Sequence, residues 1–111
     1  MIHILRERAT KKQLEEMLQE LESYVKFAVD ISQKVAAGGG ELHADCEEVL
    51  LEQGSRQQDI WGADWIPASG QVTFEALINI RSAQDNPSME IQSDSIRQKV
   101  EKIIHHLVEG T

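Results

Sequence analysis

The stretch GGGELHADCEEVLLE, residues 38–52, decides how the two halves of this chain are connected. Three glycines permit backbone conformations that other residues rarely adopt, so we predict a turn or bulge at Gly38–Gly40. A strand over 41–52 should follow, with one apolar side formed by Leu42, Ala44, Cys46, Val49 and Leu51. The alternation shifts by one residue after Cys46, and a β-bulge at Glu47–Glu48 would restore it.

Working outward, the segments on the N-terminal side predict two strands and a helix. Residues 2–5 are suited to a short edge strand. Thr10 and Gln13 have the spacing of a capping box, and leucines and methionine follow at helical spacing, which predicts a helix over 10–23. Apolar and polar residues then alternate over 25–32, which predicts a strand.

On the C-terminal side the pattern is again strand-like and then helical. We predict a third strand over 59–67, a turn at 67–70 and a fourth strand over 71–81. After a polar connection, Ser93 should cap a final helix that ends at Gly110.

These elements predict a single α+β domain over residues 1–111. An antiparallel sheet of three to four strands should carry the N-terminal and C-terminal helices on one face, as a two-layer sandwich. The other face would stay open and carry the polar residues of each strand.

Composition excludes several classes of protein. The chain has 111 residues, 27% of them charged, and a formal net charge of −8, which argues against nucleic-acid binding because phosphate contacts need clustered lysine and arginine. No apolar run approaches the length of a membrane span, and the N-terminus does not resemble a signal peptide. The single cysteine, Cys46, indicates a reducing compartment. We therefore expect a cytoplasmic protein with no nucleic-acid or membrane partner.

The open sheet face is where a site is expected. The predicted binding residues are Glu41, His43, Asp45, Glu47, Trp61, Asp64, Trp65, Glu75, Asn79 and Arg81. The two tryptophans are either core residues or part of this surface, where they would supply contact area. In this hypothesis Arg81 pairs with an acid or holds an anionic ligand, and His43 is the titrating group.

Three catalytic arrangements compete with this hypothesis. His43 and Asp45 project to the same side of a strand, and a carboxylate from Glu47, Asp64 or Glu75 could join them as the third ligand of a divalent metal. Of these sets we favour His43, Asp45 and Glu75. No other cofactor is predicted. Paired carboxylates, Asp45 or Asp64 with Glu75, would suit general acid–base work. Cys46 is better interpreted as a buried hydrophobe than as a nucleophile, and the acidic residues as a solvated face.

The sequence thus predicts a small binding or interaction module acting as a homodimer, with a small molecule or a protein as its partner. The alternative is a metal-dependent hydrolase using His43, Asp45 and Glu75, and whether the protein is an enzyme stays open. A third hypothesis is an acidic regulator that covers a basic protein.

The segments GGGELHADCEEVLLE, GSRQ, WGADW, INIR and SMEI together resemble a family of short prokaryotic proteins, many of them cyanobacterial, classified as a domain of unknown function. The likeness runs from the first helix to the last. Relatives often carry glycine and arginine where this chain reads DNPSMEI, so Asp85 and Pro87 depart from the pattern. The resemblance implies no activity, but it implies that HADCE and WGADW belong to one shared feature.

Overall fold

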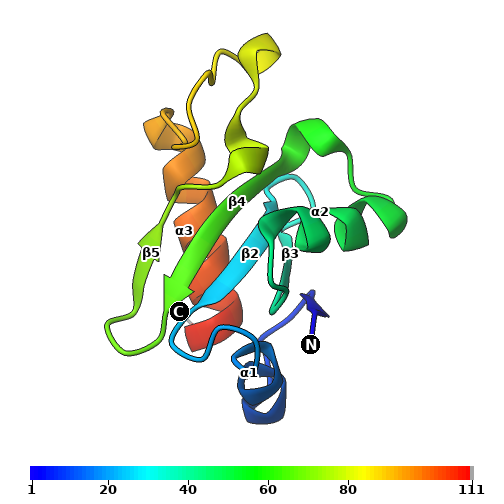
Figure 1. The fold of residues 1–111 in the computed structure, drawn as a ribbon, viewed down its shortest axis with the longest axis vertical. Helices are drawn as coiled ribbons and strands as arrows, with labels where there is room; N and C mark the ends of the chain where they lie inside the picture. Colours follow the sequence, from blue (N-terminus) through cyan, green and yellow to red (C-terminus); the bar gives the residue numbers. More distant parts are fainter. Residues whose placement is uncertain (111) are drawn as a thin grey trace.

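The structure is a computed structural model in which residues 1–110 are described. Five strands form one antiparallel sheet in the spatial order β1-β3-β2-β4-β5 (Figure 1). The strands are β1 (His3–Leu5), β2 (Val25–Asp30), β3 (Val35–Gly38), β4 (Ile60–Ile66) and β5 (Gln71–Thr73). The α+β class is confirmed, with five strands rather than three to four.

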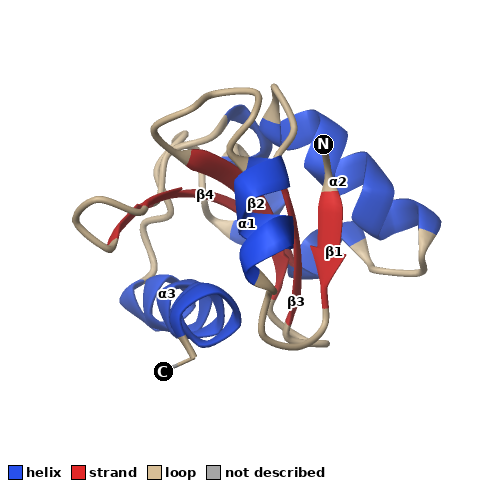
Figure 2. Ribbon diagram, turned by 90° about the horizontal axis from the view of Figure 1, so that it is seen from below, coloured by secondary structure: helices blue, strands red, loops and turns tan. Residues whose placement is uncertain are grey.

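Helices cover both faces of this sheet. They are α1 (Lys11–Met17), α2 (His43–Glu52) and α3 (Asp94–Glu109), with short 3-10 helices η1 (Gln57–Asp59), η2 (Leu77–Asn79) and η3 (Ser82–Gln84). Figures 1 and 2 show α3 on one side of the central strands and α2 on the other. The expected two-layer sandwich with an open polar face is therefore wrong, because α2 occupies that face. None of the helices in residues 1–110 is long and apolar enough to cross a membrane.

The decisive stretch forms a helix and not a strand. Cys46 and Leu50 are one turn apart and both are fully buried, whereas Leu42 and Leu51 are exposed. The shift in alternation that suggested a bulge at Glu47–Glu48 is the helical period, with Cys46, Val49 and Leu50 on one face. Alanine, glutamate and leucine, which dominate this segment, are also strong helix formers.

The glycine run is a site of close packing and not a hairpin turn. Gly38 ends β3, and a Cβ atom on it would clash with the ring of Phe27 on β2. Gly39 has φ +103°, and a Cβ there would clash with the backbone of Met1 and Met17. The glycines thus let the N-terminal segment and α1 approach the sheet.

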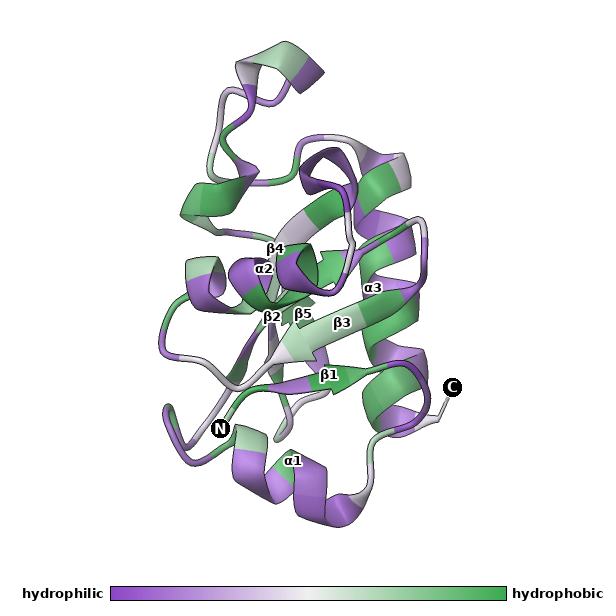
Figure 3. Cartoon of the chain, turned by 90° about the vertical axis from the view of Figure 1, so that its right-hand side faces the viewer, coloured by the Kyte–Doolittle hydropathy of each residue, from purple (hydrophilic) through white to green (hydrophobic). Residues whose placement is uncertain are grey.

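Two apolar clusters hold the layers together. On the α3 side, Phe27, Trp61 and Trp65 pack against the helix stripe, and the larger side chains of the sheet are on this side. On the α2 side the residues are smaller, and the cluster consists of Ala28, Val35, Ala37, Cys46, Leu50 and Ile60. Figure 3 shows apolar colouring along β2, β3 and α3. Small residues on one face of the sheet let α2 lie close to it.

The predicted fourth strand ends early, at Thr73. Where β4 would need a further neighbour, the Asn79 side chain takes that place: its Oδ1 accepts from Gly62 N at 2.8 Å, and its Nδ2 donates to Gly62 O at 3.0 Å. An amide side chain offers the same donor and acceptor as a backbone residue, so it can replace strand pairing at one position. Glu75 leaves the sheet and bridges to Glu90.

The ends of the two outer helices follow the predicted chemistry. Thr10 and Gln13 form the capping box with bonds of 2.9 and 3.1 Å, although α1 ends at Met17 rather than near 23. The Ser93 hydroxyl accepts from Ile96 N at 3.2 Å, and Gly110 ends α3 with φ +75°. Local capping signals therefore located these helix starts well.

Candidate functional site

The two tryptophans of the predicted surface are core residues. Trp61 and Trp65 are both buried on the α3 side of the sheet, and Trp65 Nε1 donates to Glu109 Oε2 at 3.3 Å. They therefore supply packing between β4 and α3, and the expectation that they provide contact area for a partner is corrected.

His43 and Asp64 are brought together. The His43 Nε2 lies 2.7 Å from Asp64 Oδ1 and 3.3 Å from Ala63 O, and the two side chains are 10% and 20% exposed. His43 is the first residue of α2, whose N-cap Leu42 offers no side-chain cap. The pair thus attaches the start of α2 to β4, and it joins the HADCE and WGADW segments that the resemblance placed in one shared feature.

Cys46 lies one turn after His43 on α2 but is not a nucleophile. Its side chain is fully buried, and its Sγ donates to Lys26 O at 3.6 Å. Burial raises the pKa of the Cys46 thiol to about 11, so it stays protonated at neutral pH. The interpretation of Cys46 as a core residue is confirmed.

Glu47 and Arg81 form a second internal pair. Arg81 Nη2 lies 3.8 Å from Glu47 Oε2, a buried oxygen without a hydrogen-bond partner. Because burial outweighs this attraction, the pKa of Glu47 is raised and that of Arg81 is lowered. The Arg81 guanidinium also stacks 4.6 Å from the centre of the Trp61 ring.

Arg81 and Asn79 serve the fold rather than a ligand. Arg81 donates to the carbonyls of Ile78 at 3.0 Å and Gln57 at 2.7 Å, and also to that of Ile60. Asn79 donates to further carbonyls besides that of Gly62. With its donors directed at backbone, Arg81 is not placed to hold an anion as the sequence suggested.

The expected metal ligands do not meet. Asp45 and Glu41 are exposed on and beside the first turn of α2, and Glu75 belongs to the segment beyond β5. Within residues 1–110, no group of three histidine, cysteine, aspartate or glutamate side chains is arranged to hold a metal ion. The set His43, Asp45 and Glu75, and with it the hydrolase hypothesis, gains no support.

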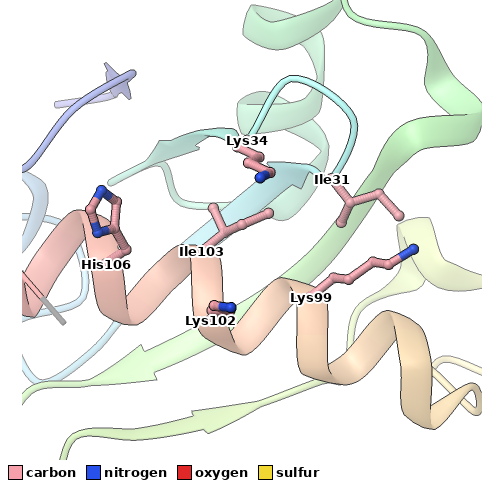
Figure 4. A pocket seen from close by; sticks show the side chains of 6 residues that line it. All are labelled: Ile31, Lys34, Lys99, Lys102, Ile103 and His106. Carbon is pink, nitrogen blue, oxygen red and sulfur yellow. The ribbon is translucent and has the colours of Figure 1, made fainter.

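A different site, which the sequence reasoning missed, lies between α3 and the turn that joins β2 to β3 (Figure 4). It is a pocket of about 460 Å³ lined by Ile31, Lys34, Lys99, Lys102, Ile103 and His106. We call these six residues the basic pocket. Lysine ammonium groups and an imidazole surround an apolar floor made by two isoleucines.

The β2–β3 turn is held rigidly by Asp30, a buried carboxylate. Its Oδ1 accepts from Ser32 N and Gln33 N, each at 2.9 Å, and its Oδ2 accepts from the Ser55 hydroxyl at 2.6 Å. Lys34 follows with φ +60°, a left-handed conformation that favours glycine or asparagine over lysine. The turn therefore presents Lys34 to the pocket at some conformational cost.

On α3 the basic groups follow the edge of the buried stripe. Lys99, Lys102 and His106 are three and four residues apart, so they share one side of the helix beside buried Ile103. This spacing is the one signal in the sequence that points to the site. It indicates a site only when the structure shows Lys34 on the opposite side of the pocket. In the sequence, His106 stands near the end of the final helix, where a basic residue is commonly explained by the helix dipole.

The basic pocket is lined by positively charged residues, whereas the chain as a whole is negatively charged. Net charge is −8, yet three of the six lysines line this one pocket. Among the residues that the structure describes, none of these three takes part in a salt bridge. Glu101 lines a shallower neighbouring hollow with Gln98, Lys102 and His105. An anion is the complement of such a cluster.

Comparison with known proteins gives a family and no activity. Neither the curated proteins nor the solved structures contain a match to this chain. The resemblance to a domain of unknown function is confirmed, since a family model covers nearly the whole sequence. The chain belongs to the family described as "Protein of unknown function (DUF5674)", whose model matches residues 3–107.

Proposed function

We propose that this protein is a binding module for a small anionic ligand, which it holds in the basic pocket. The observation that carries the proposal is the gathering of Lys34, Lys99, Lys102 and His106 around one cavity in a chain of net charge −8. The binding role inferred from the sequence is kept, and its place moves from the face under α2 to the pocket beside α3.

The shape and chemistry of the basic pocket suit a small molecule. Its volume of about 460 Å³ lies in the range of small-ligand sites. Lysines donate hydrogen bonds and positive charge to oxyanions, while the isoleucine floor and the lysine stems exclude water. The rest of the acidic surface would repel long polyanions, which favours a compact ligand over a nucleic acid.

Calorimetric titration with pyrophosphate at low ionic strength tests the proposal. We expect binding to the unmodified protein that weakens as salt is added, because exposed charges are screened. The double variant Lys99→Gln/Lys102→Gln should weaken it about tenfold, at ordinary energies for two lost ion pairs. The matched control is Lys11→Gln/Lys12→Gln, which makes the same charge change on α1.

Two outcomes contradict the proposal. In one, the unmodified protein does not bind pyrophosphate. In the other, the α1 control loses as much affinity as the pocket variant, so that total charge and not the pocket decides binding. Circular dichroism of both variants checks that the fold is retained.

The homodimer and the cytoplasmic location stay predictions. For the homodimer, the tryptophans no longer contribute, but Leu77 on η2 is 71% exposed and Ile80 beside it is exposed too. Sedimentation of the unmodified protein and of Leu77→Lys gives the test: a dimer that the variant dissociates supports it, and a monomer in both contradicts it.

A further inference from the structure

We infer that the ligand of the basic pocket is a small molecule with two phosphate-type groups about 10 Å apart, joined by an apolar spacer. This inference rests on the proposed function and adds the class of ligand. It follows from the positions of the basic groups along the pocket, from the apolar floor between them and from the presence of lysine instead of arginine.

The basic groups are spread along the pocket and not focused on one point. Lys99 and His106 are seven residues apart on α3, which is about 10 Å along a helix at 1.5 Å per residue. Figure 4 shows them at the two ends of the pocket, with Lys102 between them and Lys34 opposite. One phosphate can be shared by Lys99 and Lys102, one turn apart, but it leaves His106 unused. Two anionic groups engage both ends.

The floor between these ends is apolar. Ile103 is buried against the core apart from the surface it shows to the pocket, and Ile31 packs on the same cluster. Neither side chain can bond to a hydrated oxyanion, so a continuous chain of phosphates would lose water there without a new partner. A hydrocarbon or aromatic spacer instead removes apolar surface from water.

The choice of cations favours phosphate over carboxylate. Arginine, whose planar fork matches carboxylate and phosphate alike, is absent from the pocket lining, and Arg6, Arg81 and Arg97 bond to other parts of the protein. Arg81 bonds to backbone carbonyls, and Arg97 donates to Glu90 Oε2 at 2.9 Å. The pocket keeps lysines, which act as point charges and attract a phosphate group, with close to two negative charges at neutral pH, more strongly than a carboxylate with one.

A series of alkyl phosphonates separates span, charge and apolar contact. Calorimetry would compare hexane-1,6-bisphosphonate with methylenebisphosphonate, which has the same charged groups at short span, and with hexylphosphonate, which has the chain but one charged group. We expect the first to bind at least about fivefold more tightly than either of the others, since it alone reaches both ends and covers the floor. Octanedioate, with two carboxylates at similar span, should bind more weakly than hexane-1,6-bisphosphonate.

The variant His106→Ala sharpens the test. It should reduce binding of hexane-1,6-bisphosphonate and leave that of methylenebisphosphonate unchanged, because the short ligand does not reach the His106 end. His3→Ala, outside the pocket, is the control and should change neither. Because His106 is exposed, its removal should leave the fold intact, which circular dichroism checks.

The outcomes are distinguishable. If methylenebisphosphonate binds as tightly as the longer compound, the inferred ligand class is overturned while anion binding stands. Octanedioate binding more tightly than hexane-1,6-bisphosphonate overturns the phosphate assignment, and an equally tight single-stranded oligonucleotide overturns the small-molecule assignment. Binding by none of these ligands overturns both the inference and the proposed function.

Discussion

Two groups of polar side chains in this protein differ in what they bond to. One, the internal network, consists of His43, Glu47, Asp64, Asn79 and Arg81 around α2 and η2, and most of its polar atoms have protein partners. The other is the basic pocket, where like charges stand together without salt-bridge partners among the described residues. Buried polar groups need internal partners to be tolerated, whereas clustered exposed cations gain a partner only from outside. Polar residues that satisfy each other indicate architecture, and unsatisfied like charges indicate a ligand.

The largest effect is expected where the internal network is most buried, at Asn79. Asn79→Ala removes four hydrogen bonds and leaves the buried groups of Gly62 without partners. We expect it to lower the free energy of unfolding by about 3 kcal/mol in urea denaturation. Gln84→Ala, an exposed amide that also bonds to a carbonyl, is the control and should cost under about 1 kcal/mol. Similar losses for the two variants would contradict the structural role of Asn79.

The His43–Asp64 pair should come next. A double-mutant cycle with His43→Ala and Asp64→Ala should give a coupling free energy of about 1 kcal/mol, since the bond is short and partly shielded. The matched pair is His3–Glu16, which is longer at 3.1 Å and more exposed at 22% and 21%, so its coupling should be smaller. Equal coupling free energies for the two pairs would show that burial does not strengthen the His43–Asp64 bond at the start of α2.

Glu47 should make stability depend on pH in a specific direction. Its pKa is raised by burial, so the native state binds this proton more tightly than the unfolded state does. Stability from the protonated form is therefore present at low pH and is lost as the pH rises from about 4.5 through the raised pKa. The Glu47→Gln variant cannot ionise there, and its stability relative to the unmodified protein should increase over that range.

The check is chemical denaturation of both proteins from pH 4 upward, with Glu48→Gln as the control on the exposed side of α2. A stability difference between Glu47→Gln and the unmodified protein that stays constant would show that Arg81 attracts the carboxylate as strongly as burial disfavours it. A difference that shifts toward the unmodified protein as the pH rises would show that the attraction is the stronger of the two.

The smallest effect on stability, and the sharpest contrast with Asn79, is expected at Lys34. Glycine adopts φ +60° without strain, so Lys34→Gly should leave the free energy of unfolding unchanged or raise it by up to about 1 kcal/mol. The same change should weaken pyrophosphate binding several-fold. A variant that is as stable as the parent and binds as well would remove Lys34 from the site.

Local signals in the sequence predicted local structure well. The alternation over 25–32 and 59–67 gave β2 and β4 with Trp61, Ala63 and Trp65 on one side, and the capping residues gave the starts of α1 and α3. The strand predicted over 41–52 was wrong. Three apolar residues at alternate positions in this segment fit a strand, while the spacing of Cys46 and Leu50 fits a helix. A short apolar pattern can fit both the two-residue period of a strand and the 3.6-residue period of a helix. Packing against the sheet decides which of the two structures forms.

The candidate site could be predicted only in part. The sequence drew attention to His43 and Asp64, and they do meet, but as a bond within the internal network. The basic pocket was missed because Lys34 and Lys99 are 65 positions apart in the sequence, and neither lies in a motif. Residues that gather by packing of distant elements leave no local pattern.

The sequence by itself determined the α+β class, the two central strands, the starts of α1 and α3 and the burial of Cys46, because each depends on neighbours within a few residues. Tertiary structure alone decided which face of the sheet α2 covers, which polar residues became internal partners and where the free cations gather. Those outcomes depend on contacts between segments far apart in the chain, and the free energy of such contacts is set by burial and pairing that no local spacing encodes.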